Sequence, residues 1–265
     1  MTNEELIQLQ DTQYEILKAM VDVCDRHQIR YSLAYGTILG SVRHGGSIPW
    51  DCDIDTFLDA ENFEKFEKVA SELPDCYELK AVGGKWNGLS RIYKKNTLIF
   101  QPSHGREEAF PIHIDVFKLE YARPLSGIQA KVVGALSRYL MVAKLSKYEK
   151  GWIYQQFRNQ PLKRLVCRSG DLIKLFASEE TMEKWVHDLV VSDRKENDYV
   201  LIQDLKKRYP ASYFHDLVKM KYEDSAFLIP AEYDKLLTLM YGNYMEFPPE
   251  SERFTSSMQD LVVEF

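Results

Sequence analysis

Three aspartates alternate with uncharged residues in the segment Asp51-Cys52-Asp53-Ile54-Asp55. In a strand, alternate side chains share one face, so the three carboxylates are expected to point the same way. Carboxylates held close together repel one another, and their pKa values rise unless a cation offsets the charge. Because Mg²⁺ is bound by carboxylate oxygens of this kind, the alternation predicts a metal site.

Other interpretations of this acidic segment are weaker. Acids at a strand edge often face solvent, and an isolated Asp-x-Asp pair also occurs in metal-dependent glycosyltransferases. The same alternation opens an EF-hand loop, but position 6 of that loop is Thr56 instead of glycine, and position 12 is Asn62 instead of glutamate. The EF-hand is therefore excluded, and the other two alternatives stay open.

A glycine-threonine pair, Gly36-Thr37, follows an apolar segment at residues 31–35 that we expect to be a strand. A short helix is predicted at residues 38–44, with Thr37 as its cap. Glycine lets a phosphate approach the backbone, and a helix start offers unpaired N–H groups and a favourable dipole. The pair is thus a candidate phosphate site, whereas the plainer interpretation is a helix cap alone.

Asp115 is a single acid inside a strongly apolar segment at residues 112–119. A carboxylate in such a strand is costly unless it is paired or bound to a metal. We expect a third metal carboxylate beside Asp53 and Asp55. The alternative is a strand whose Asp115 side is wet.

The order of predicted elements indicates an α/β (α+β) protein with a mixed sheet. We expect a core domain at residues 1–120 and mainly helical additions at residues 121–265, whose last part packs on the core. The elements expected in the core are a helix at 4–27, strands at 31–35, 52–58 and 112–119, helices at 38–44 and 60–73 with Asp59 as N-cap, and a hairpin that pairs 91–93 with 98–100.

The formal net charge of -6 argues against a globally basic nucleic-acid binder. Residues 118–174 nevertheless contain twelve Lys or Arg and three Asp or Glu, a local charge of +9. An anionic partner or a solvated helical face explains such a segment equally well. The composition of this segment resembles that of helices at a membrane interface, through Lys131, Arg138, Lys144, Lys147, Trp152 and Lys163.

The four cysteines form no Cys-x-x-Cys pair, and their spacing suits no zinc site, so reduced thiols are expected. The N-terminus is polar and acidic, unlike a signal peptide, and no run of about 18–20 apolar residues predicts a membrane span. We therefore expect a cytoplasmic protein, with peripheral contact at the inner face of the cell membrane as a further option.

The segment GTILGSVRHGGSIPWDCDID, residues 36–55, resembles the signature of the LicD-like phosphorylcholine transferases and the related fukutin-type enzymes. Residues 229–249, IPAEYDKLLTLMYGNYMEFPP, are similar to the closing segment of that family, whereas the basic middle matches poorly. The signature departs from its commonest form at Cys52, where an acid is usual, and at Ser47, where an aromatic residue is usual. Cys52 is expected to face away from the metal, so its departure is compatible with activity.

The resemblance implies a nucleotidyltransferase-like core that acts as a metal-dependent phosphotransferase. The implied reaction moves phosphocholine, or a related polyol phosphate, from a CDP-linked donor such as CDP-choline to a sugar hydroxyl and releases CMP. The implied acceptor is a glycan or lipid-linked glycan, such as a lipopolysaccharide or teichoic acid precursor. Mg²⁺, with Mn²⁺ as an alternative, is the implied cofactor, which offsets charge on the diphosphate and the leaving CMP.

The resemblance also implies roles for single residues. Asp53 and Asp55 are the main metal ligands, and Asp115 completes the site or acts as base toward the acceptor hydroxyl. The residues implied to bind substrate are Gly36, Thr37, Arg43, His44, Trp50, Asp51 and Arg91. Structural packing is an equal alternative for Arg43, and a plain exposed strand arginine is the alternative for Arg91.

A choline headgroup needs an aromatic or acidic cage for its cation. The aromatic residues available near the two matched segments are Trp50, Trp86, Tyr241 and Tyr244. Aromatic residues at such places more often belong to the core.

Two other functions use the same residues. A nucleotidyltransferase would keep the nucleoside monophosphate on a small-molecule or glycan acceptor instead of releasing CMP. A non-catalytic protein of the same fold would bind an anionic glycan through the basic helices.

Overall fold

The computed structural model describes residues 1–82, 88–100, 109–145, 161, 169, 172–173, 175–195, 198–201, 208–253 and 261–265. They belong to two compact units. The first contains Met1–Ala81, Leu89–Leu119 and Ser212–Phe265, and the second is centred on Glu120–Ala211.

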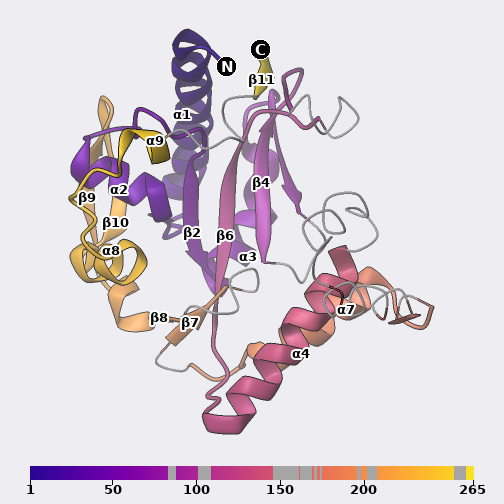
Figure 1. The fold of residues 1–265 in the computed structure, drawn as a ribbon. Coiled ribbons are helices and arrows are strands. Elements are labelled where there is room, and N and C mark those ends of the chain that lie inside the picture. The colour runs from indigo at the N-terminus through magenta and orange to yellow at the C-terminus, as the bar shows by residue number, and fades with distance from the viewer. Residues whose placement is uncertain are drawn as a thin grey trace. The chain divides into compact units, whose positions relative to one another are not determined.

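A mixed sheet forms the centre of the first unit (Figure 1). Its strands follow the order β1 (Ser32–Leu33), β2 (Asp55–Asp59), β6 (His113–Tyr121), β4 (Leu89–Lys94) and β3 (Tyr77–Ala81). β2 and β6 are parallel, and the other neighbours in this order are antiparallel. This sheet, combined with helices, confirms the predicted α/β class.

Two helices cover one face of this sheet, α1 (Asn3–Arg26) and α3 (Ala60–Val69) (Figure 1). α1 begins with a capping box, in which the Thr2 hydroxyl accepts from the Glu5 N–H and the Glu5 carboxylate accepts from the Thr2 N–H. α3 begins at the predicted N-cap, Asp59, whose carboxylate accepts from the Asn62 N–H at 2.9 Å. Both helices start where local side-chain chemistry predicts them to start.

The predicted strand at residues 52–58 is wrong at its start, because β2 begins only at Asp55. The carbonyls just before the strand accept hydrogen bonds from side chains of α1 as well as from β6, where the Asp115 N–H donates to Ile54 O at 2.9 Å. Gln10 Nε2 on α1 donates to Ile48 O at 3.0 Å and to Asp51 O at 2.7 Å. Asp51 and Asp53 therefore lie in an irregular lead-in to the strand.

The helix after the glycine-threonine pair also begins earlier than predicted. α2 spans Tyr35–Arg43, and its N-cap is Ala34, so the prediction of Thr37 as the cap is wrong. Thr37 is buried inside the first turns of α2, where its hydroxyl accepts a hydrogen bond from the Asp55 N–H at 2.9 Å. The threonine thus connects α2 to the start of β2.

The predicted hairpin between residues 91–93 and 98–100 does not form. β4 pairs with β3 and β6, whereas β5 (Leu98–Phe100) pairs with β11 (Val262–Glu264). The Thr97 hydroxyl explains the divergence, since it donates to Lys94 O at 2.7 Å and accepts from the Ile112 N–H at 3.0 Å. These bonds turn the chain away from β4.

A C-terminal hairpin, which the sequence pattern did not indicate, packs beside α2. It consists of β9 (Leu217–Tyr222) and β10 (Ser225–Pro230), and α8 (Tyr233–Tyr241) follows it. At the hairpin tip, Glu223 accepts from the Ser47 N–H at 2.7 Å, and its own N–H donates to Gly45 O at 2.8 Å. The loop after α2 is therefore held by a segment from the far end of the chain.

The second unit pairs two helices, α4 (Gly127–Leu145) and α7 (Glu179–Val190). Its core includes Leu140 and Ala143 from α4 with Met182 and Val186 from α7. β6 continues past Leu119 into this unit, where it pairs with β7 (Asp198–Val200), and β7 pairs with β8 (Arg208–Pro210). Within the described ranges, no helix has the length and apolar character needed to cross a bilayer.

The close approach at Gly40 gives a test of the α2 environment. A Cβ at this position would lie 2.5 Å from Gly46 O and 3.4 Å from Ile48 N, and backbone atoms cannot move aside easily. We expect Gly40→Ala to lower the free energy of unfolding by about 1–3 kcal/mol in urea titrations. Gly134→Ala in α4 is the control, because its nearest neighbour is the flexible end of Arg138 at 3.2 Å. That control is expected to be neutral or to stabilise by about 0.5–1 kcal/mol, and equal losses in both variants would contradict the assignment.

Candidate active site

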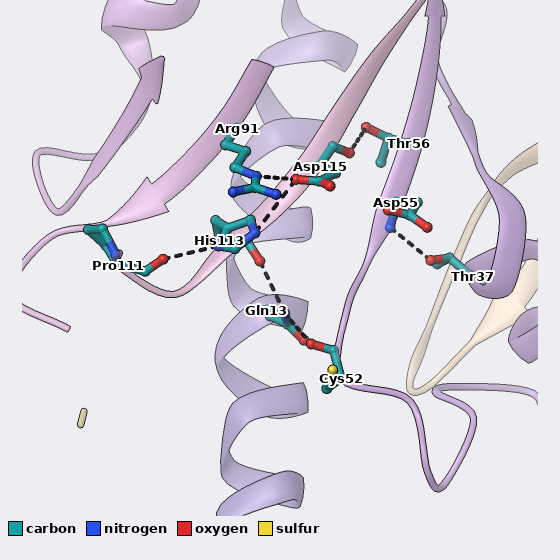
Figure 2. Close-up of polar contacts among 9 residues, drawn as sticks. All are labelled: Gln13, Thr37, Cys52, Asp55, Thr56, Arg91, Pro111, His113 and Asp115. Atoms are coloured by element: carbon teal, nitrogen blue, oxygen red, sulfur yellow. Dashed lines mark hydrogen bonds and ion pairs between the residues drawn. The ribbon is translucent and has the colours of Figure 1, made fainter. Parts of the chain in front are cut away.

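Asp55 and Asp115 occupy neighbouring positions on adjacent strands. The register of the parallel pair β2 and β6 places them opposite each other, and Figure 2 shows both side chains on these strands. Paired residues of neighbouring strands project to the same face of a sheet, so the two carboxylates share one face. Asp55 is 9% exposed. Backbone pairing alone thus brings together acids that lie far apart in the sequence.

Asp51 and Asp53 join this pair from the lead-in to β2. The two carboxyl groups interact electrostatically, and the charge of Asp53 raises the pKa of Asp51. Asp51 Oδ2 lies 2.7 Å from the place where a Cβ on Gly36 would be. The glycine predicted to admit a phosphate therefore makes room for the carboxylate of Asp51.

We define the carboxylate cluster as Asp51, Asp53, Asp55 and Asp115, and burial with mutual repulsion raises the pKa values of the first three. Burial, followed by the charge of Asp53, raises the pKa of Asp51 to about 8. Burial also raises the pKa of Asp53 and is the dominant cause, and the charge of Asp115 adds to it. The pKa of Asp55 lies well above its ordinary value because of burial and the charges of the other three acids. The cluster consequently favours binding of protons or of a cation.

Arg91 holds Asp115 in place. The antiparallel register of β4 and β6 pairs the two residues, and Arg91 Nε donates to Asp115 Oδ1 at 2.7 Å (Figure 2). Burial works against a charged guanidinium here, but the Asp115 carboxylate outweighs it, so the pKa of Arg91 is raised. Arg91 is therefore not the plain exposed strand arginine of the alternative interpretation, since its side chain is 24% exposed.

His113 is a second neighbour of Asp115 on β6, and its Nε2 lies 3.6 Å from Asp115 Oδ1. Its Nδ1 is 3.0 Å from Pro111 O, and because a carbonyl only accepts, Nδ1 carries the ring proton. Burial, together with the charge of Arg91, lowers the pKa of His113 to about 4. The ring is therefore neutral near pH 7 and adds no charge to the cluster.

Gln13 joins the two acidic segments, a role that sequence patterns did not indicate. Its Nε2 donates to Cys52 O at 2.9 Å and to His113 O at 3.1 Å, which come from the lead-in to β2 and from β6 (Figure 2). The side chain is almost fully buried, at 2% exposure. A glutamine on a largely apolar face of the predicted helix is the sequence signal that could have found it.

Arg43 and His44 contact the C-terminal segment of the chain. Arg43 Nη1 donates to Tyr244 O at 2.8 Å and to Glu246 O at 3.2 Å, while Nε donates to His44 Nε2 at 3.0 Å. The guanidinium also lies 4.9 Å from the ring centre of Phe247. These bonds support the packing alternative for Arg43. Substrate contact by Arg43 and His44 stays a prediction.

The residues considered for a choline cage have partners of their own. The ring of Trp50 is faced by the guanidinium of Arg253 at 5.0 Å, and the Tyr244 hydroxyl donates to Asp234 at 2.6 Å. Tyr241 is 45% exposed, and Trp86 lies outside the described residues. A cation from the protein thus occupies one face of Trp50.

The carboxylate cluster has the donor chemistry of a site for a hard divalent cation. It presents buried carboxylate oxygens whose repulsion a cation would relieve. Within the described part of the chain, no three His, Cys, Asp or Glu side chains already stand in a ligand arrangement. The carboxylate oxygens of the cluster are of the chemical type that a hard divalent cation binds.

Removal of the Gln13 amide tests its role as a brace. Gln13→Met leaves the carbonyls of Cys52 and His113 without their donor, so we expect a loss of about 1–3 kcal/mol in unfolding free energy. Gln8→Met, at an exposed position of the same helix, is the control and is expected to change stability by less than about 0.5 kcal/mol. Equal stability of the two variants in urea titrations would show that the hydrogen bonds of Gln13 do not stabilise the fold.

The raised pKa of Asp51 predicts a pH dependence of stability in chelator-treated protein. Folded Asp51 keeps its proton up to about pH 8, whereas an unfolded aspartate releases it near 3.8. Stability from this group is therefore lost as pH rises between these values. We expect Asp51→Asn to flatten the fall of Tm from pH 5 to 8 and to raise Tm at pH 8 by roughly 2–8 °C, for about 1–2 kcal/mol of relieved repulsion. Asp75→Asn, at an exposed site, is the control, and an unchanged slope in Asp51→Asn would contradict the shift.

Comparisons with known proteins agree with the resemblance carried by residues 36–55. Residues 28–129 match the family model described as LicD/FKTN/FKRP, nucleotidyltransferase domain. The chain is 24% identical over 256 residues to the lipopolysaccharide cholinephosphotransferase LicD of Haemophilus influenzae, covering 91% of each chain. It is also 34% identical over 68 residues to an uncharacterised protein of Rickettsia typhi, covering 25% of this chain and 22% of that one.

The matched domain contains the entire carboxylate cluster together with Gly36, Thr37 and Arg91. The similarity to the Haemophilus protein extends over nearly the whole chain, including parts outside that domain. Residues 28–129 of this chain therefore match a LicD/FKTN/FKRP nucleotidyltransferase domain, and the chain is similar to LicD over most of its length.

Proposed function

We propose that this chain transfers phosphocholine, or a related polyol phosphate, from a CDP-linked donor to a sugar hydroxyl of a lipopolysaccharide or another surface glycan, releasing CMP. The observation that carries the proposal is the convergence of Asp51, Asp53, Asp55 and Asp115 inside the matched domain. The name of the Haemophilus relative supports the choice of headgroup and acceptor.

A divalent cation, Mg²⁺ or Mn²⁺, is part of this proposal. Asp53, Asp55 and Asp115 would hold it, and it would supply positive charge to the diphosphate of the donor. The chain's own residues prepare the site for this role. Arg91 fixes one oxygen of Asp115, and Thr37 fixes the backbone at Asp55, so the ligands are held before substrate arrives.

The protonation state of the cluster separates the roles of the four acids. Burial and the charge of Asp53 raise the pKa of Asp51 to about 8, so Asp51 carries a proton at neutral pH until a cation displaces it. Asp115 is the acid paired with Arg91, and that pair keeps its orientation fixed while it serves as ligand or receives the proton of the acceptor hydroxyl.

The test is incubation of the purified protein with CDP-choline, CDP-ribitol or CDP-glycerol, Mg²⁺ and a lipopolysaccharide that lacks phosphocholine. We expect CMP release with CDP-choline and a matching mass increase of the acceptor. Asp53→Asn and Asp115→Asn are each expected to lower the rate at least about a hundredfold, because a ligand to the cation is lost. Asp75→Asn, which removes an exposed acid, is expected to keep the rate.

Other results would overturn the assignment. CMP attached to the acceptor would indicate nucleotidyl transfer by the same carboxylates. Full activity of Asp53→Asn would show that the cluster does not carry the reaction. Preference for CDP-ribitol or CDP-glycerol would keep the reaction type and change the headgroup.

A further inference from the structure

The second unit exposes apolar side chains along one line of α4. Ile128, Val132 and Leu136 are 79%, 58% and 43% exposed. They are four residues apart, and at about 100° per residue they cover roughly 80° of the helix circumference. The α4 side chains that pack in the core, Leu140 and Ala143, lie nearer the C-terminal end of the helix. These three residues, called the α4 stripe below, are therefore not part of the core.

A turn just before α7 extends this apolar surface. Leu172, Leu175 and Phe176 are 63%, 74% and 89% exposed. Ile173, from the same turn, lines an apolar cavity of about 470 Å³ together with Leu136 of the α4 stripe and Trp185 of α7. The apolar surface is thus continuous from α4 to the turn, and an exposed patch of this extent marks an interaction site.

Cationic side chains flank the α4 stripe on one side of the helix. The sequence of α4, GIQAKVVGALSRYLMVAKL, contains Lys and Arg but no acid. Its Lys131 and Arg138, with Arg208 of β8, line a second pocket of about 400 Å³. The whole segment 118–174 carries a charge of +9. Of the basic segment noted in the sequence, Lys147, Trp152, Lys163 and the side chain of Lys144 lie outside the described residues.

We propose that the α4 stripe and the turn at 172–176 dock on an anionic lipid bilayer. The apolar side chains enter the boundary between headgroups and acyl chains, and Lys131 and Arg138 contact lipid phosphates. Charge complementarity selects this occupant. A nucleic acid would leave the stripe in water, and a second copy of the chain would bring like charges together. This docking concerns where the protein works and does not depend on the reaction proposed above.

Co-sedimentation of the full chain with vesicles tests the proposal without any activity measurement. Vesicles of phosphatidylcholine alone are compared with vesicles in which a third of the lipid is phosphatidylglycerol. We expect binding to the anionic vesicles that weakens with added salt. Two double variants are tested. One combines Val132→Asp with Phe176→Asp, and the other combines Lys131→Glu with Arg138→Glu. Each is expected to weaken binding to anionic vesicles at least tenfold. All four positions are exposed, so circular dichroism is expected to show unchanged folding.

Leu239→Asp on α8 is the matched control, because it places an acid at a half-exposed leucine of the first unit. It is expected to bind vesicles like the unmodified protein. Absence of binding to anionic vesicles, or equal binding by all variants, would overturn the proposal. So would light scattering that shows a dimer lost in the Val132→Asp and Phe176→Asp variant, because a second copy would then be the occupant.

Discussion

The parallel pairing of β2 and β6 is the constraint on which the candidate site depends. Its register sets Asp55 beside Asp115, and the lead-in to β2 adds Asp51 and Asp53. Like charges in a buried place oppose folding, so the backbone hydrogen bonds of the sheet work against the electrostatics of the site. A site that is strained until it binds its ligand is a common feature of catalytic centres.

Supports from three different elements keep this arrangement in place. Gln13 on α1 spans the two acidic segments, Thr37 on α2 fixes the first residue of β2, and Arg91 on β4 fixes Asp115. None of these supports is adjacent to the acids in sequence. The acids are therefore held by tertiary structure, which explains how an irregular lead-in can present carboxylates in a defined way.

The parts of the fold that could be predicted from sequence are those with local causes. The α1 capping box, the Asp59 cap and the apolar periodicity of β6 are encoded within a few residues. The predictions for the start of β2, the first turn of α2 and the partner of β5 were wrong, because each feature is decided by a distant side chain or strand. Gln10 and Gln13 of α1 donate to backbone carbonyls just before β2, and β11 lies at residues 262–264. The acids of the site carried a strong pattern, whereas their supports carried almost none.

The tip of the β9–β10 hairpin has a consequence for how this domain can be made or moved. The Glu223 carboxylate accepts a hydrogen bond from the Ser47 N–H, which lies 176 positions earlier in the sequence. A nascent chain that has been synthesised only to the end of the matched domain, residues 28–129, still lacks this hydrogen bond. The loop after α2 can reach its final structure only once residue 223 has been synthesised, and a graft cut at the edges of the matched domain would leave α1 and the hairpin behind.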